Sequence, residues 1–126
     1  MPTVMCPLTL YSDDTSGNRS KKWNKFDYWC LLLAGLPRHE NTKLFNIHFI
    51  GTSNRANCLE ISAPIVGDLL LLEQRGIVVY DAFLQKQVKL FAPVLLFMGD
   101  NPRASELLNH MGPTARKFCR MCLASY

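Results

Sequence analysis

Apolar residues gather in three short segments in the first 50 residues of the chain. Residues 4–12 and residues 28–36 are predicted to be strands, because each is an apolar run of strand length bounded by polar or turn-forming residues. Residues 45–50 alternate apolar with polar side chains, which is typical of a half-buried strand. Short loops join the three segments, so we expect an antiparallel meander.

A helical spacing of apolar residues follows the third segment. Ser62 can cap a helix, and Pro64 is suited to the first helical turn. The apolar positions then recur with helical spacing until Gly76, a residue type that commonly ends helices. We therefore predict one helix between Ser62 and Gly76.

The next segments are again strand-like. Residues 77–80 and residues 88–91 are predicted to form a small hairpin around residues 85–87. Residues 94–98 form a continuous apolar run, which indicates a further core strand. The predicted order is therefore three strands, a helix, a hairpin and a fourth core strand.

A second helix is expected after this strand. Asn101 can cap it, and Pro102 can open its first turn. Residues 114–123 are predicted to be helical or to form a knuckle. The residues expected to face inward are Leu107, Leu108 and Met111.

Length and composition are typical of one globular domain. The chain has 126 residues, 48% of them hydrophobic, and a net charge of +4. This mild basic excess permits contact with nucleic acid without requiring it. Basic residues concentrate in two stretches, which either contact a nucleic-acid backbone or form a solvated surface. They are Arg19, Lys21, Lys22 and Lys25, and Arg116, Lys117 and Arg120.

Cysteine usage and hydropathy indicate the cellular compartment in which the chain is expected. The five cysteines are an odd number, and the N-terminus lacks the basic region of a signal peptide. The longest apolar run, residues 91–98, is far shorter than the roughly 18 residues that a membrane span needs. We expect an intracellular, reducing location, without secretion and without membrane insertion.

Two aspartates follow predicted core strands. Asp13 comes directly after residues 4–12, and Asp100 follows residues 94–98 and a glycine. If the strands lie side by side, about 4.8 Å apart, the two carboxylates can share a metal ion. Nucleases and transposases hold two metal ions roughly 3.5–4 Å apart in such sites. Alternatively, both acids are turn residues, a common role of aspartate.

A C-x-x-C pair stands near the end of the chain. Cys119 and Cys122 supply two of the four ligands that a structural zinc site usually has. His110 is a candidate third ligand, and its alternative is a helix-surface histidine. A redox pair normally follows a strand and opens a helix, so half of a zinc site fits this position better.

Several blocks of residues together resemble a transposase-derived family that is abundant in fungal genomes. This group is similar to the CACTA-like and Kyakuja–Dileera–Zisupton DNA transposases. The match extends over residues 8–123, and its blocks are residues 11–18, 20–24, 34–37, 46–49, 99–105 and 119–122.

The resemblance implies an RNase H-like catalytic core with a D-D-E acid triad. Such an α/β core has a three-strand antiparallel meander, a helix and a fourth strand parallel to the first; this sequence adds a small hairpin and C-terminal helices. The resemblance assigns Asp13 to the first acid of the triad, with Asp14 as a fallback, and Asp100 to the second acid. These residues are expected to bind Mg²⁺ or Mn²⁺. Cys119 and Cys122 match zinc-type cysteines of the group. Within the block of residues 99–105, Arg103 is expected to contact DNA.

The third acid of the triad is not matched. Family members carry it after the cysteines, and Glu106 stands on the wrong helix to replace it. We therefore expect residues 1–126 to be a single, truncated core with a C-x-x-C knuckle at about residues 113–126. It is a fragment, a decayed copy or a partly retained domain. The resemblance implies an ancestral activity of metal-dependent cleavage and transfer of DNA strands at transposon ends in the nucleus, and the chain alone is expected to be inactive.

Two non-enzymatic functions stay open. In the first, the chain is a DNA- or protein-binding remnant of a mobile element that acts through its basic stretches. In the second, it is an assembly domain in which Cys119 and Cys122 complete a zinc site with another chain. Self-association through the truncated sheet edge is also expected, because such an edge exposes apolar surface.

Overall fold

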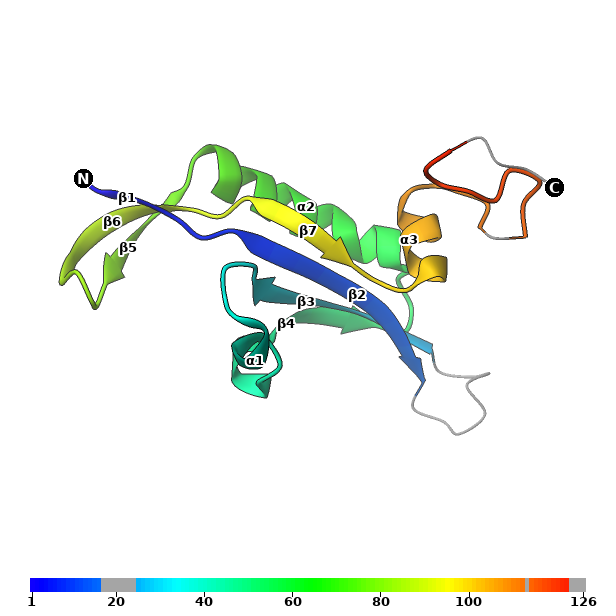
Figure 1. The fold of residues 1–126 in the computed structure, drawn as a ribbon, viewed down its shortest axis with the longest axis horizontal. Helices are drawn as coiled ribbons and strands as arrows, with labels where there is room; N and C mark the ends of the chain where they lie inside the picture. The colour runs from blue at the N-terminus through cyan, green and yellow to red at the C-terminus, as the bar shows by residue number, and fades with distance from the viewer. Residues whose placement is uncertain (17–24, 113, 123–126) are drawn as a thin grey trace.

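The computed structural model describes residues 1–16, 25–112 and 114–122, which form a mixed α/β fold with two sheets. Its helical segments are α1 (Arg38–Asn41), the 3-10 helix η1 (Leu44–Asn46), α2 (Cys58–Gln74) and α3 (Asn101–Leu107). Its strands are β1 (Thr3–Met5), β2 (Leu8–Ser16), β3 (Lys25–Leu33), β4 (His48–Ser53), β5 (Ile77–Asp81), β6 (Lys86–Phe91) and β7 (Val94–Met98). Figure 1 shows an elongated molecule with β1, β5 and β6 at one end and α3 at the other.

The larger sheet has the strand order β4-β3-β2-β7. β2 pairs with β3, and β3 pairs with β4, in antiparallel fashion, which confirms the predicted meander. β7 lies on the other side of β2 and runs parallel to it, with Tyr11 opposite Met98. The predicted position of the fourth strand beside the first is therefore also confirmed. The third strand begins later than expected, at His48, because η1 takes up the preceding residues.

Two prolines divide one long pair of parallel chain segments into two sheets. The segment expected to be a single strand, residues 4–12, is broken at Pro7, which has no N–H to give to a ladder. Its second part, β2, continues past the expected end to Ser16, so Asp13 lies within the strand and does not follow it, because β3 pairs with it as far as Ser16. The parallel neighbour of this segment is broken at Pro93, between β6 and β7. The N–H of Cys6 donates to the carbonyl oxygen of Phe91, and that of Leu8 to the carbonyl oxygen of Pro93, each at 2.8 Å. These two hydrogen bonds connect the parallel pairing of β1 with β6 to the parallel pairing of β2 with β7.

α2 begins earlier than the sequence pattern indicates. Asn57 caps it, because its side chain accepts the N–H of Glu60 at 2.9 Å while the Glu60 carboxylate accepts the N–H of Asn57 at 2.8 Å. The expected cap, Ser62, lies inside the helix and donates to the carbonyl oxygen of Leu59. The predicted helix end is confirmed, since Gly76 has a φ of 63° directly after the last turn.

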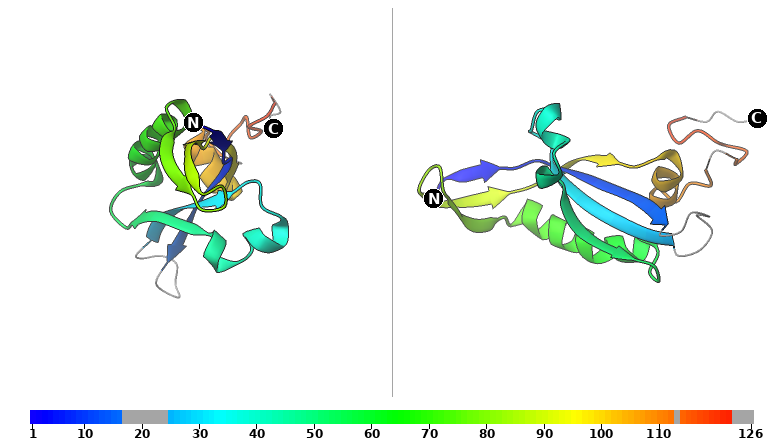
Figure 2. Two further views of the ribbon diagram at one scale, coloured as in Figure 1. Left: turned by 90° about the vertical axis from the view of Figure 1, so that its left-hand side faces the viewer. Right: turned by 90° about the horizontal axis from the view of Figure 1, so that it is seen from below.

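The core lies between α2 and one face of the larger sheet. Leu10 of β2, Trp29 of β3 and Cys58 of α2 form its buried centre. The partly buried side chains around this centre are Leu31, Ile61, Ile65, Leu69 and Leu107. Both views of Figure 2 place α2 on this face and the α1 segment on the opposite side of the sheet.

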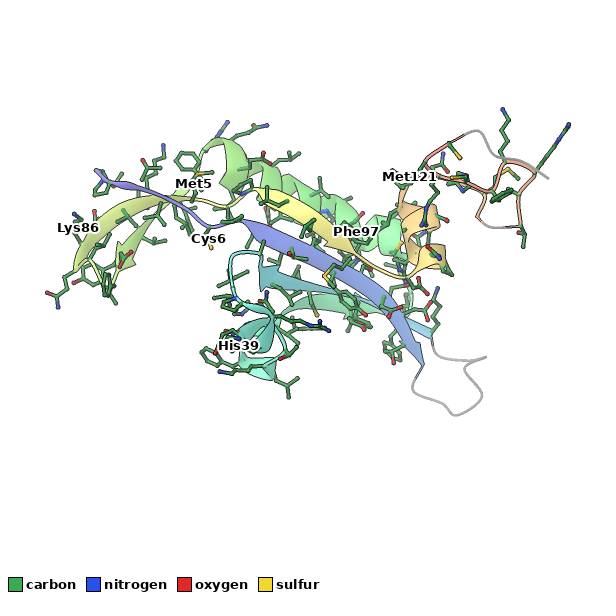
Figure 3. The ribbon with its side chains drawn as sticks, in the orientation of Figure 1. Met5, Cys6, His39, Lys86, Phe97 and Met121 are labelled. Carbon is green, nitrogen blue, oxygen red and sulfur yellow. The ribbon has the colours of Figure 1, made fainter. Side chains whose placement is uncertain are left out.

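The predicted hairpin is confirmed as β5 and β6, but its turn precedes the expected residues. The carboxylate of Asp81 accepts the N–H groups of Phe83 and Leu84, and Gln85 completes the turn with a φ of 49°. Lys86 already belongs to β6 and pairs with Asp81. In Figure 3 Lys86 marks this end of the molecule, and Met121 lies at the far end.

α3 differs from its prediction in its cap and its inward face. Asp100, not Asn101, is the N-cap. Leu107 packs against the core as expected, whereas Leu108 is 66% exposed and Met111 is 87% exposed. The helix ends before these two residues, so the helical spacing that would turn them inward is lost. The described residues of the segment 114–122 contain turns and bends and no helix.

Apolar side chains are exposed along β7, the edge strand of the larger sheet. All five of its residues are exposed, with Leu95 the most accessible at 63%.

Within the described part of the chain, no helix has the length and apolar character needed to cross a membrane.

Candidate functional site

Asp13 and Asp100 follow the last paired residues of the neighbouring strands β2 and β7. Tyr11 of β2 lies opposite Met98 of β7, the last pair of this parallel register, and each acid stands two residues further along its own segment. The close approach continues past the strand end, because a Cβ atom added at Gly99 would lie 3.1 Å from a carbonyl oxygen of β2. The chain segments that carry the two predicted acids therefore lie side by side up to the residue before each acid.

Tyr11 orients the carboxylate of Asp13. Its hydroxyl donates to Oδ2 of Asp13 at 2.9 Å, and the N–H of Asp14 donates to Oδ1 at 2.8 Å. A hydrogen bond with Tyr28, burial, and the bond to Asp13 together raise the pKa of Tyr11 well above its usual value. Tyr11 therefore stays a neutral hydroxyl that donates to Asp13 over the whole physiological range.

The first turn of α3 orients Asp100. Its backbone is extended, and its Oδ1 accepts the N–H of Arg103 at 2.8 Å, as an N-cap does. The side chain is exposed at the sheet end. A carboxylate has two oxygens with several acceptor positions, so one oxygen can cap the helix while the other binds a ligand.

The chemistry of this acid pair fits a hard divalent cation such as Mg²⁺ or Mn²⁺. Mg²⁺ takes oxygen ligands and often uses one or two carboxylates together with waters and substrate phosphates. In the described ranges, no three His, Cys, Asp or Glu side chains gather into a group that could hold a metal ion. Asp13 and Asp100 therefore offer two protein ligands, not a complete triad.

Asp14 does not belong to this pair. Successive residues of a strand point to opposite faces, and Asp14 lies opposite Asp27 on the face that α2 covers. Its carboxylate is 3.1 Å from Nζ of Lys25 and 4.0 Å from Nη2 of Arg103. The expectation that Asp14 can replace Asp13 is wrong, because its side chain is on the other face and is paired with cations.

A buried charged cluster lies on that other face. Arg103 is 3% exposed and Asp27 is 8% exposed, and Nη2 of Arg103 donates to Oδ1 of Asp27. Nη1 of Arg103 donates to Glu106 at 2.9 Å. Burial acts to lower the pKa of Arg103, but hydrogen bonds with Asp27 and Cys58 outweigh it, so the pKa is raised. The expectation that Arg103 contacts DNA is therefore wrong, since its charge is turned inward and neutralised.

Sequence reasoning missed this cluster, although one pattern points to it. Asp27 stands two residues before Trp29, so the alternation of a strand puts both on one face. Trp29 is 2% exposed, and a charged residue on such a face needs a charged partner. The partner, Arg103, is distant in sequence and could not be identified from this alternation.

The environment of Cys119 favours a thiolate. Its Sγ accepts the N–H of Met121 at 3.4 Å. A hydrogen bond with the Cys122 thiol, followed by backbone hydrogen bonds from Met121 and Cys122, lowers the pKa of Cys119 below its ordinary value. Thiolates are the form of cysteine that binds zinc, so the pair suits half of a zinc site.

His110 does not complete this site. Its Nδ1 accepts the N–H of Gly112 at 3.0 Å, so the neutral ring carries its proton on Nε2. All three residues of the expected set are described, and His110 does not come together with Cys119 and Cys122 into a group that could hold a metal ion. In this structure His110 is therefore not placed together with the two cysteines, and its role as a third zinc ligand stays a prediction.

The predicted DNA-contacting residues have different surroundings. Arg116 and Lys117 are exposed. Lys25 is engaged with two aspartates of the sheet, at 3.1 Å and 3.7 Å, and Arg120 is hydrogen-bonded to α3. The basic residues that lie outside the described part of the chain are Arg19, Lys21 and Lys22.

Comparisons with protein-family models, with curated proteins and with solved structures find no match to this chain.

Proposed function

We propose that the chain is part of an RNase H-like core for metal-dependent cleavage and transfer of DNA strands, as in the transposases that its sequence resembles. The observation that carries the proposal is the parallel pairing of β2 with β7, in which Asp13 and Asp100 each stand two residues beyond the last pair, Tyr11 with Met98. The order β4-β3-β2-β7, with α2 on one face, supports it further, because an RNase H-like core is expected to have this arrangement.

Each side chain of the pair has a defined role. Asp13 and Asp100 bind the cation, while Tyr11 holds Asp13 and the N–H of Arg103 holds Asp100. When bound, the divalent cation would activate water or a 3′-hydroxyl group and stabilise the leaving oxygen of the phosphodiester. Because the described residues offer two acids instead of three, we expect weak metal binding and no transposase activity from this chain alone.

DNA is the proposed partner, and a nuclear location follows from that partner. Arg116 and Lys117 are exposed in the segment that follows α3. Lysine and arginine side chains bind nucleic-acid phosphates with a strong dependence on salt concentration.

Calorimetric titration with Mn²⁺ tests the acid pair. We expect weak binding by the wild type and its loss in both Asp13→Asn and Asp100→Asn. Asparagine at position 100 removes the charge but retains a good N-cap, so α3 is preserved. Asp68→Asn, at an exposed position on α2, is the matched control and should bind like the wild type. Equal binding in all four proteins, or none in the wild type, would reject the proposal.

The exposed strand β7 favours a second candidate, a non-enzymatic binding module. β7 has no charged residue, and all of its side chains are exposed. Such a module would bind DNA through Arg116 and Lys117, or a protein through the β7 edge. Salt-dependent DNA binding that persists in Asp13→Asn and Asp100→Asn would support this candidate over the first.

A further inference from the structure

Arg120, which stands between the two C-terminal cysteines, holds the first turn of α3. Its Nη2 donates to Oδ1 of Asn101 at 2.7 Å, and its Nη1 donates to the carbonyl oxygen of Asn101 at 2.7 Å. Nη1 also lies 3.2 Å from Oγ of the buried Ser105. A planar guanidinium that binds one residue through two donors fixes its orientation as well as its position.

This contact acts directly beside the candidate site. Asn101 follows Asp100, the acid that caps α3. α3 has seven residues, and a helix of this length is not stable without external contacts. Arg103 anchors α3 to the sheet through its ion pairs. Arg120 anchors α3 to the C-terminal segment through its hydrogen bond with Asn101. The position of Asp100 therefore depends on both arginines.

The backbone that carries Arg120 has no regular structure to hold it. Residues 114–122 contain turns and bends and neither helix nor strand. Within residues 119–122, here named the cysteine turn, Sγ of Cys119 accepts the N–H of Met121 across Arg120. The contacts of the thiol pair therefore set the shape of the turn from which Arg120 reaches α3.

We propose that Arg120 is a positioning residue that couples the cysteine turn to Asp100, so that the state of the thiol pair sets how firmly Asp100 is held. A soft metal ion that bridges Cys119 and Cys122 stiffens the turn and strengthens the hold. The consequence for cation affinity rests on the proposed function, whereas the coupling rests on the hydrogen bonds of Arg120. Coupling between two binding sites is reciprocal, so a cation on the acid pair also strengthens metal binding by the thiols.

Amide hydrogen exchange of Arg103, followed by NMR, measures the coupling, because this N–H is the one that Asp100 caps. In Arg120→Met we expect exchange roughly tenfold faster than in the wild type, since charge-assisted hydrogen bonds are lost. Arg120→Lys keeps the charge but not the paired donors, so its exchange rate should lie between those of the wild type and Arg120→Met. Arg116→Met removes an exposed arginine of the same segment and should leave the exchange unchanged.

A second arm addresses the thiols. Zn²⁺ should slow the exchange of the Arg103 amide in the wild type, and it should have no effect in Cys119→Ser or in Arg120→Met. Slowing that persists in both variants would overturn the role of the cysteine turn. The comparison of the wild type with Cys119→Ser does not need Arg120→Met, so slowing that persists in Cys119→Ser overturns the role of the cysteine turn even where Arg120→Met fails to fold.

Mn²⁺ affinity separates the two proposals. If the acid pair binds Mn²⁺, Arg120→Met should weaken this binding several-fold while Arg116→Met does not. Unchanged exchange of the Arg103 amide in a folded Arg120→Met protein would overturn the coupling, whatever the metal data show. A wild type that binds no Mn²⁺ would reject the proposed function, and the exchange rates would still decide the coupling.

Discussion

Asp27 and Arg103 form a buried ion pair that joins β3 to α3 across 76 positions of the sequence. Buried charges persist in proteins when they are paired and hydrogen-bonded, and Arg103 meets this condition through Asp27 and Glu106. Leu107 adds an apolar contact of α3 with the core. The pair thus fixes α3 at the end of the sheet, and Asp100 at the start of α3 is brought beside β2 as a result.

Removal of this arginine should strongly destabilise the fold. We expect Arg103→Met to lower the free energy of unfolding by about 3–5 kcal/mol, because it leaves the charge of Asp27 buried without its partner. Lys25→Met is the matched control; this side chain is 54% exposed, so its loss should cost no more than about 1 kcal/mol. Urea denaturation measures both values, and equal small losses would contradict the burial of the pair.

Tyr11 should make the stability depend on pH in the alkaline range. Its pKa is raised in the folded state, first by the hydrogen bond with Tyr28 and then by burial. A raised pKa gives stability that is fully present below the unfolded value of about 10 and lost as the pH rises beyond it. Between about pH 10 and 12, Tyr11→Phe should therefore lose less stability than the wild type. Denaturation at several pH values checks this, and Tyr80→Phe, at a 66% exposed position, should follow the wild type.

The cysteines should differ in their reactivity. Burial raises the pKa of the Cys30 and Cys58 thiols, whereas hydrogen bonds lower that of Cys119. Iodoacetamide should therefore modify Cys119 first, as mass spectrometry of the peptides can show. Cys122→Ala removes the thiol whose hydrogen bond contributes most to the low pKa of Cys119, so it should move the alkylation of Cys119 to higher pH. Reaction of Cys58 as fast as Cys119 would contradict this prediction.

The β7 edge should promote self-association. An exposed apolar edge strand presents unpaired backbone groups to a second chain, and Leu96 lies in the middle of this edge at 57% exposure. We expect Leu96→Lys to reduce association in sedimentation experiments. Leu70→Lys changes an exposed leucine of helix α2, which presents no unpaired strand edge, so it should have little effect on association. If only Leu70→Lys reduces association, the helix surface and not β7 mediates it.

The N-cap of α2 offers a simple test of the helix start. Asn57→Ala should lower the free energy of unfolding by about 1 kcal/mol, because the capping box with Glu60 is lost. Ser62→Ala should change it by less than about 0.5 kcal/mol, because Ser62 lies within the helix. Thermal denaturation of the two variants distinguishes the observed cap from the one that the sequence pattern favours.

Local sequence patterns were sufficient for most of the elements. The apolar runs of β3 and β7 and the turn residues around β5 and β6 predict their positions, because strand length and turn chemistry are properties of neighbouring residues. The break at Pro7 and the start of α2 at Asn57 were missed. Both depend on local residues whose importance is clear only once the hydrogen-bonded partners, Phe91 and Glu60, are known.

The sequence alone indicated that Asp13 and Asp100 each follow an apolar strand segment, although β2 continues past Asp13 to Ser16. The tertiary structure decided that these strands are neighbours, that Asp14 faces the opposite side, and that Arg103 is a buried partner of Asp27. The physical reason is strand register. A shift of one residue in the pairing of β2 with β3 would exchange the two faces of the sheet, and that register is set by contacts between distant segments of the chain.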